Sequence, residues 1–221
     1  MKKLIAFFGM MALLLPGSFA QVDKTQMGLN VSKKYAQNLG NLSQLQWKRK
    51  MEGFVDGNPA MSSVSSVTLS SDMKLVAIVI SQQSYVEKKR GIRGKVQKSV
   101  VSDVNEYVKN AVELVGRYII LSQGQMVDLF NKGTLTEQGN AIQADAANIL
   151  NPGDRLIYKF DKSTLLYQSQ DISTVMGGDP IKAKVNYETV NGTNRVTNVA
   201  IELPGPKVNV KLTNFEYAKK Q

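Results

Sequence analysis

The sequence predicts an α+β fold in which a strongly curved antiparallel sheet, or incomplete β-barrel, is covered by helices inserted mid-chain. In the first and last thirds of the chain, apolar and polar residues alternate, which is typical of strands with one buried face. In the middle third, apolar residues recur at the three- and four-residue spacing of helices. Strands and helices do not alternate one by one, so a parallel sheet is not expected.

The first third predicts one helix and then three strands. The helix covers Val22 to Asn38 and ends at Gly40-Asn41, and the first strand covers Leu45 to Glu52. A second strand lies between Val64 and Leu69. The run from Leu75 to Ile80 is apolar at every position, which predicts a central strand covered on both faces.

The middle third predicts a loop followed by three helices. The stretch from Glu87 to Lys98 is dense in basic residues and contains two glycines, so it is interpreted as a loop. The helices are expected over about 101–118, 124–132 and 135–150. The first of them is apolar enough to pack on the sheet, either permanently or as a movable lid.

The final third predicts antiparallel strands between Leu156 and Tyr217, separated by turns. Asn191-Gly192 is a strong signal for a tight hairpin. The inward parity of the last strand changes before Phe215, which predicts a bulge near Thr213-Asn214.

The first twenty residues have the layout of a secretory signal peptide. Two lysines precede a short apolar run, and small residues stand at Ser18 and Ala20. A permanent anchor helix is the alternative, but the run is too short to span a bilayer. We therefore expect residues 1–20 to be removed and residues 21–221 to form one domain that is soluble in the periplasm. No cysteine is present to carry a lipid anchor.

The composition favours binding over catalysis. The chain has no cysteine and no histidine, so disulfides, thiol nucleophiles, serine–histidine hydrolysis and the usual zinc sites lack their residues. We expect no enzyme activity, no catalytic residue, no metal and no cofactor. The net charge of +10 favours anionic partners such as phospholipid headgroups or acidic envelope polymers.

The order of the predicted elements resembles the LolA/LolB-like fold of periplasmic lipoprotein carriers. The likeness is best in the last third, at the Asp161-Lys162-Ser163 turn, the Asn191-Gly192-Thr193 hairpin and the closing strand from Val208 to Tyr217. The segment Trp47-Lys48-Arg49 is similar to a first strand of that group. The chain departs from the group in having about three strands before the helices and an extra basic segment. The resemblance implies an incomplete barrel closed by helices, with acyl chains held between them.

Two sets of candidate site residues follow from these patterns. An apolar inner face of strands and helices would hold a lipid or acylated ligand, although a filled core has the same sequence pattern. Its members are Trp47, Met51, Tyr118, Met126, Phe130, Tyr158, Phe160, Tyr167, Tyr187 and Ile201. The basic segment would meet an anionic headgroup or a membrane surface, or would be a solvated loop; its candidates are Lys88, Lys89, Arg90 and Arg93.

The leading hypothesis is a soluble periplasmic carrier or chaperone for a hydrophobic, acylated ligand. The alternative is a non-enzymatic interaction module with a filled core that docks on an envelope protein or anionic polymer through residues 88–98. Nucleic acid is not an expected partner, because only Tyr85 accompanies the basic residues.

Overall fold

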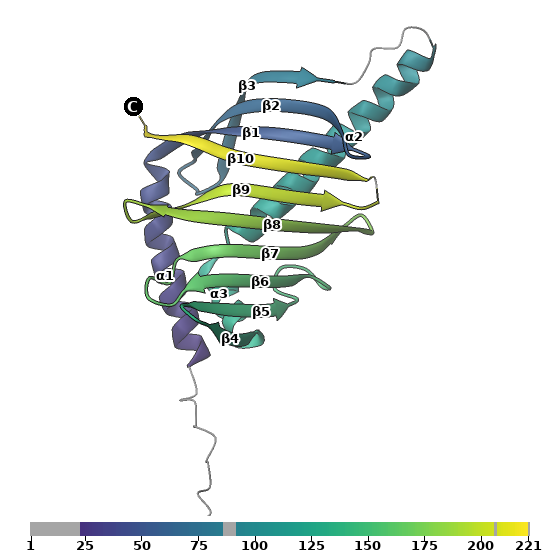
Figure 1. The fold of residues 1–221 in the computed structure, drawn as a ribbon. Coiled ribbons are helices and arrows are strands. Elements are labelled where there is room, and N and C mark those ends of the chain that lie inside the picture. The colour runs from purple at the N-terminus through teal and green to yellow at the C-terminus, as the bar shows by residue number, and fades with distance from the viewer. Residues whose placement is uncertain (1–22, 86–91, 206, 221) are drawn as a thin grey trace, which may run out of the picture.

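The computed structural model describes residues 23–85, 92–205 and 207–220, with the backbone alone over 92–105. Three helices and ten strands follow one another in these residues (Figure 1). In chain order they are α1 (Lys24–Ser43), β1 (Leu45–Val55), β2 (Asn58–Leu69), β3 (Leu75–Ser84), α2 (Ile92–Ile119), α3 (Gln123–Lys132), β4 (Thr134–Gln138), β5 (Ala141–Ala147), β6 (Arg155–Asp161), β7 (Tyr167–Met176), β8 (Asp179–Val190), β9 (Thr193–Leu203) and β10 (Val208–Lys219).

All ten strands form one antiparallel sheet with the order β3-β2-β1-β10-β9-β8-β7-β6-β5-β4. The first and last strands of the chain, β1 and β10, pair in its interior. The two edges, β3 and β4, are the strands on either side of the helices α2 and α3. The sheet is therefore a meander that is open where the helices are inserted, which confirms the predicted fold class.

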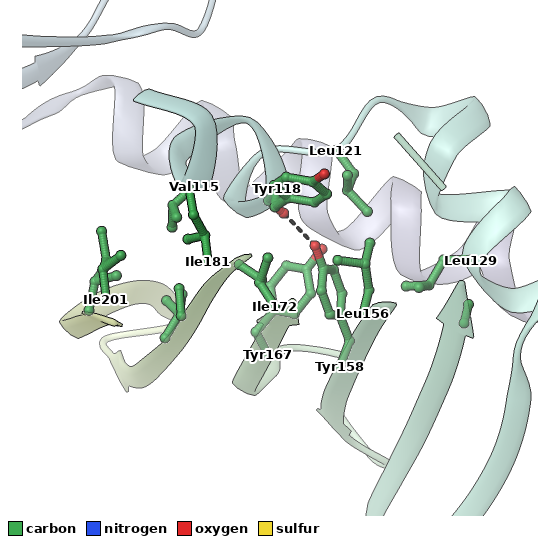
Figure 2. Packing of buried hydrophobic residues seen from close by; sticks show 14 of the residues in the cluster. Val115, Tyr118, Leu121, Leu129, Leu156, Tyr158, Tyr167, Ile172, Ile181 and Ile201 are labelled. Carbon is green, nitrogen blue, oxygen red and sulfur yellow. Dashed lines mark hydrogen bonds between the residues drawn. The ribbon is translucent and has the colours of Figure 1, made fainter. Parts of the chain in front are cut away.

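The helices cover one face of this sheet. In Figure 1, α1 runs along one end of the strands and α2 runs obliquely behind them. Buried side chains of all three helices and of strands β5–β10 form one hydrophobic cluster, so all three helices pack against the same inner face. Figure 2 shows Tyr118 and Leu121 of the helix layer facing Tyr158, Tyr167 and Ile172 of the sheet.

Tyrosine hydroxyls fix the end of α2 on the sheet. The last carbonyls of a helix have no partner within it and need donors from elsewhere. The Tyr158 hydroxyl donates to the carbonyl of Tyr118, and the Tyr35 hydroxyl donates to the carbonyl of Ile119 over 2.8 Å (Figure 2 shows the first of these bonds). The C-terminal half of α2 is thus docked by hydrogen bonds as well as by apolar contact.

Several predicted elements are confirmed. The helix over about 124–132 corresponds to α3, and strands fill the final third as expected. The Asn191-Gly192 hairpin joins β8 to β9 with positive φ at both residues, 50° and 74°. The bulge in the last strand lies slightly later than predicted, because Lys48 pairs with Phe215 and Gln46 pairs with Ala218.

Three predictions about the ends and the middle of the chain are wrong. Helix α1 continues past Gly40-Asn41 to Ser43, since a helix tolerates a single glycine. The supposed loop up to Lys98 is helical from Ile92, because Lys, Arg and Val are compatible with a helix even where they are crowded. The stretch 135–150 forms β4 and β5 instead of a helix. In β5, Ile142, Ala144 and Ala146 are buried at every second position, and this packing overrides the helix propensity of alanine.

The prediction of a central strand at Leu75–Ile80 is also wrong, because β3 is an edge strand. It pairs only with β2, and Ile78 and Val79 are 68% and 58% exposed, although they point to opposite faces. An apolar run shows that a strand could be covered on both faces, but not that anything covers it. An exposed, uncharged edge strand of this length is uncommon in soluble proteins.

Two glycines of α1 give a test of the helix packing. A Cβ on Gly28 would lie 3.0 Å from Cα of Val127 and 3.3 Å from Cβ of Phe130 in α3, whereas a Cβ on Gly40 would meet nothing within 4 Å. We expect Gly40→Ala to raise the free energy of unfolding by about 0.5–1 kcal/mol through helix propensity. Gly28→Ala should lower it by about 1 kcal/mol or more, because α1 and α3 must separate. Urea unfolding measures both changes in the free energy of unfolding. Equal increases for the two variants would show that α1 and α3 do not pack closely.

Candidate functional site

The predicted ligand-binding residues fall into two groups in the structure. Seven are buried in the main core, with at most 4% of their surface exposed, so the inner face is filled by side chains there: Tyr118, Met126, Phe130, Tyr158, Phe160, Tyr167 and Ile201. Met51 packs partly buried against this cluster. Trp47 and Tyr187 instead line a pocket. Contact of any of them with a ligand remains a prediction.

This pocket lies where the helix layer meets the β1 side of the sheet and has a volume of about 50 Å³. That is room for a few waters or one small polar group, and well below the several hundred Å³ of a typical small-molecule site. Apolar side chains from both layers make most of the wall: Leu39, Leu42, Trp47, Leu69, Leu75, Ile119, Ile120 and Val196.

One side of the pocket is aromatic. The ring of Trp47 in β1 stacks on that of Tyr217 in β10, with centroids 5.3 Å apart. The guanidinium of Arg195 lies over the Tyr217 ring, 4.4 Å from its centre. The Tyr217 hydroxyl donates to the carbonyl of Val196 over 2.7 Å. These contacts hold two large planar side chains in fixed positions at the pocket wall.

A hydrogen-bonded amide connects this aromatic side to a cation. The side-chain oxygen of Asn214 accepts from Nε1 of Trp47 over 3.2 Å and from Nε of Arg49 over 2.8 Å. Its amide nitrogen donates to the carbonyl of Val196 over 3.0 Å. Arg49 and Asn214 are direct partners across β1 and β10, so strand register sets this geometry.

A second asparagine pair joins α1 to the start of β9. Asn38 donates from its side chain to the carbonyl of Asn194 over 2.8 Å and accepts from the backbone N–H of Asn194 over 2.7 Å. The amide nitrogen of Asn194 donates to the carbonyl of Tyr167 over 2.9 Å. Both asparagines are buried, and both line the pocket.

Not every polar atom of the pocket wall has a partner. The hydroxyl of Tyr187 and the side-chain oxygen of Asn194 are buried and form no hydrogen bond with the described residues. Both amide atoms of Gln170, in the middle of the inner face, are in the same state. A buried polar group without a partner costs about 1–3 kcal/mol, so such groups are rare in folded proteins.

Burial also changes the ionisation of this region. It raises the pKa of the Tyr187 and Tyr217 phenols and lowers the pKa of the Arg49 guanidinium, because a charge is less well solvated there. Among the described residues no carboxylate forms an ion pair with Arg49.

The sequence analysis missed Arg49, Asn38, Asn194 and Asn214 as pocket residues. The spacing Trp47-x-Arg49 on a strand does place both side chains on one face, so Arg49 could have been found. The three asparagines could not, since they come together only through strand pairing and the packing of α1.

The basic candidates lie largely outside the described residues. Lys88, Lys89 and Arg90 belong to the part of the chain that is not described, and of Arg93 only the backbone, within α2, is described. Within the described ranges, no group of three or more His, Cys, Asp or Glu residues is arranged to hold a metal ion. No helix in the described ranges combines the length and the apolar character needed to cross a bilayer.

Comparison with known proteins finds similarity in structure only. No family model matches the chain, and no curated protein matches its sequence. A DUF1329 family protein from Desulfovibrio piger matches with a TM-score of 0.43 and 12% identity over 90% of this chain and 94% of that one. A LolA superfamily protein from Nitrosomonas europaea matches with a TM-score of 0.42 and 8% identity, over 88% of this chain and 94% of that one. A putative outer membrane lipoprotein-sorting protein domain from Vibrio parahaemolyticus matches with a TM-score of 0.43 and 7% identity, over 89% of this chain and 94% of that one.

Two of these matches are named for the LolA superfamily or for lipoprotein sorting, the group that the order of elements resembles. They concern the course of the chain alone and say nothing of what this chain binds.

The buried tyrosines predict a loss of stability at alkaline pH. Burial raises the pKa of five of them: Tyr35, Tyr158, Tyr167, Tyr187 and Tyr217. Below about pH 10, the ordinary pKa of tyrosine, folded and unfolded chains both keep these protons, and the free energy of unfolding is unaffected. Above it the unfolded chain releases protons that the folded chain retains. The free energy of unfolding should then fall by up to about 1.4 kcal/mol per pH unit for each such tyrosine.

Urea unfolding between about pH 7 and pH 11, followed with tyrosinate absorbance, measures this effect. The chain has no histidine, so no histidine titration should change its stability between pH 6 and 8. Full ionisation of all tyrosines in the folded protein near pH 10 would contradict the described burial.

Proposed function

We propose that this protein is a soluble periplasmic carrier or chaperone that binds a hydrophobic, acylated ligand between its curved sheet and its helices. It is released by cleavage of residues 1–20, carries no lipid anchor and has no enzyme activity. The ligand enters at the pocket beside Trp47. The helices separate from the inner face to admit the chain of the ligand.

The observation that carries this proposal is the pocket together with the exposed inner face of β3. Leu69 and Leu75 are paired neighbours in β2 and β3, and both line the pocket. Further along β3, Ala77 and Val79 point to the same inner side and are exposed. An apolar strip thus leads from the pocket to solvent, as an entry path for an acyl chain requires.

The unpartnered amide of Gln170 gives further support. It is fully buried in the middle of the inner face, beside Tyr158 and Val185 in neighbouring strands. In a core that stays closed, a buried amide without a partner only destabilises the fold. An opening of the helix layer would allow water to hydrate this amide. Burial of an acyl chain gains about 0.8 kcal/mol per methylene group, which would compensate for the apolar packing between helices and sheet that opening disrupts.

A second candidate function is the non-enzymatic interaction module. The filled inner face favours it, because seven of the predicted ligand-binding side chains already pack against one another. Such a module would dock on an envelope protein or an anionic polymer and would take up no lipid.

Trp47, the only tryptophan, allows ligand entry to be measured directly. A neutral probe with bromine in mid-chain, such as a dibromostearic methyl ester, should quench Trp47 fluorescence saturably, because bromine quenches indole on close approach. The unbrominated ester should compete with it. Protein isolated from its own envelope should carry lipid in native mass spectrometry.

Two size variants provide matched controls for this experiment. Leu39→Phe fills the pocket and should weaken quenching about fivefold or more. Val175→Phe adds the same ring at an exposed position of β7 that is not part of the pocket wall, and should have no effect. Absence of quenching, with ligand-free protein in mass spectrometry, would favour the interaction module.

Gln170 separates the two candidate functions. Gln170→Leu removes the unpartnered amide with little change of volume, so the free energy of unfolding should rise by about 1–3 kcal/mol. In a carrier, uptake of the brominated ester should fall, because the closed state is stabilised. Gln168→Leu, on the exposed side of the same strand, should change stability by less than about 0.5 kcal/mol and leave uptake unchanged. Increased stability with undiminished uptake would refute the role of helix opening.

A further inference from the structure

We propose that the pocket beside Trp47 binds the acidic end of the ligand, and that the ligand is therefore an anionic amphiphile with a carboxylate or phosphate group. Arg49 supplies the cation, and Tyr187 and Asn194 complete the site. This inference rests on the proposed function, since it identifies the chemical class of the carried molecule.

Arg49 differs from the basic residues around it in having no counter-ion among the described residues. On the opposite face of β1, Lys48 pairs with Glu216 at 2.5 Å and Lys50 pairs with Glu52 at 2.7 Å. Arg49 has one side-chain hydrogen bond within the described ranges, from Nε to Asn214. Its two terminal nitrogens are left for another acceptor.

The wall of the pocket makes this arrangement costly without a ligand. Arg49 is partly buried in a pocket wall that also contains Trp47 and Leu69, and burial lowers the pKa of its guanidinium. A cation in such surroundings is strongly stabilised by a charge-assisted bond to a carboxylate or phosphate, because planar guanidinium donors match these oxygens in pairs. The aromatic rings also exclude water from one side, which strengthens the attraction.

Two buried atoms of the same pocket need partners of opposite kinds. The Tyr187 hydroxyl can donate to an oxygen of the acidic group, and Tyr187 and Arg49 line the same pocket. Asn194 as a residue is 1% exposed, and its buried side-chain oxygen can only accept. A ligand that satisfies all three carries an O–H or N–H donor beside its acidic group, as in a phosphate monoester, a hydroxy acid or an N-acyl amino acid.

The size of the pocket agrees with binding of the acidic end of the ligand alone. A volume of about 50 Å³ accommodates an acidic group but no acyl chain. The chain would leave along Leu69 and Leu75 toward the inner face of β3. The anion and the chain therefore bind in different parts of the site, and their contributions can be measured separately.

Quenching of Trp47 by matched brominated probes tests the proposal. Dibromostearic acid and a brominated alkyl phosphate should bind at least about tenfold more tightly than the neutral ester. A brominated alkylamine should bind more weakly than the ester. Arg49→Met should remove the preference for the acids and leave the ester unchanged, and Arg49→Lys should retain part of it.

Further variants and probes keep the result interpretable. Arg155→Met removes an exposed cation remote from the pocket and should preserve every affinity. If Arg49→Met does not fold, Tyr187→Phe still tests the site, because loss of its hydroxyl should weaken the acids alone. Inorganic phosphate should not displace the brominated alkyl phosphate when both are at the same concentration. Displacement would show that the site binds free phosphate and would refute the proposal that the ligand is an anionic amphiphile.

The outcomes for the two proposals are distinct. If acid, ester and amine bind equally and Arg49→Met changes none of them, the carrier function stands and the anionic class is refuted. If no probe quenches Trp47, both proposals are refuted.

Discussion

The antiparallel pairing of β1 with β10 is the constraint on which the pocket depends. It joins the two ends of the meander inside one sheet, so the opening of that sheet falls beside the inserted helices. The same pairing places Arg49 opposite Asn214, while the bulge in β10 lets the Tyr217 ring stack on Trp47. Arg49 and Asn214 are 165 positions apart in the sequence, and Trp47 and Asn214 are 167 apart. The site therefore exists only when the sheet is complete.

The inner face combines tight apolar packing with polar atoms that have no partner. Hydrophobic burial, which is nondirectional, holds the helices over β5–β10, and tyrosine hydroxyls fix the end of α2 at Tyr118 and Ile119. Gln170, Tyr187 and Asn194 oppose this packing, because each buries a polar atom that is unsatisfied by the described residues. A closed state with such a cost is poised for a partner to supply the missing hydrogen bonds. This opposition is the physical basis of the proposed carrier function.

The two edges of the sheet show contrasting designs. Strand β4 is short, and its Glu137 forms an ion pair with Lys162. Strand β3 is twice as long, has no charged residue and exposes apolar side chains on both faces. Natural sheets protect their edges by shortness and charge, so β4 follows the usual pattern and β3 departs from it. The departure lies beside the pocket, where the proposal places the acyl chain.

The sequence by itself determined the sheet class, the hairpin at Asn191-Gly192 and the inward positions of residues such as Tyr158, because side-chain parity and turn chemistry are local properties. It did not determine where β3 lies, since an apolar run fits a covered centre and an exposed edge equally well. The sequence pattern also predicted a helix over 135–150, where the packing of Ile142, Ala144 and Ala146 stabilises strands instead. Only the tertiary structure decided that the inner face is filled, and that a small pocket remains at its end beside Arg49. Volume and charge compensation depend on distances between segments that are remote in the chain, and alternation along the sequence carries no such distances.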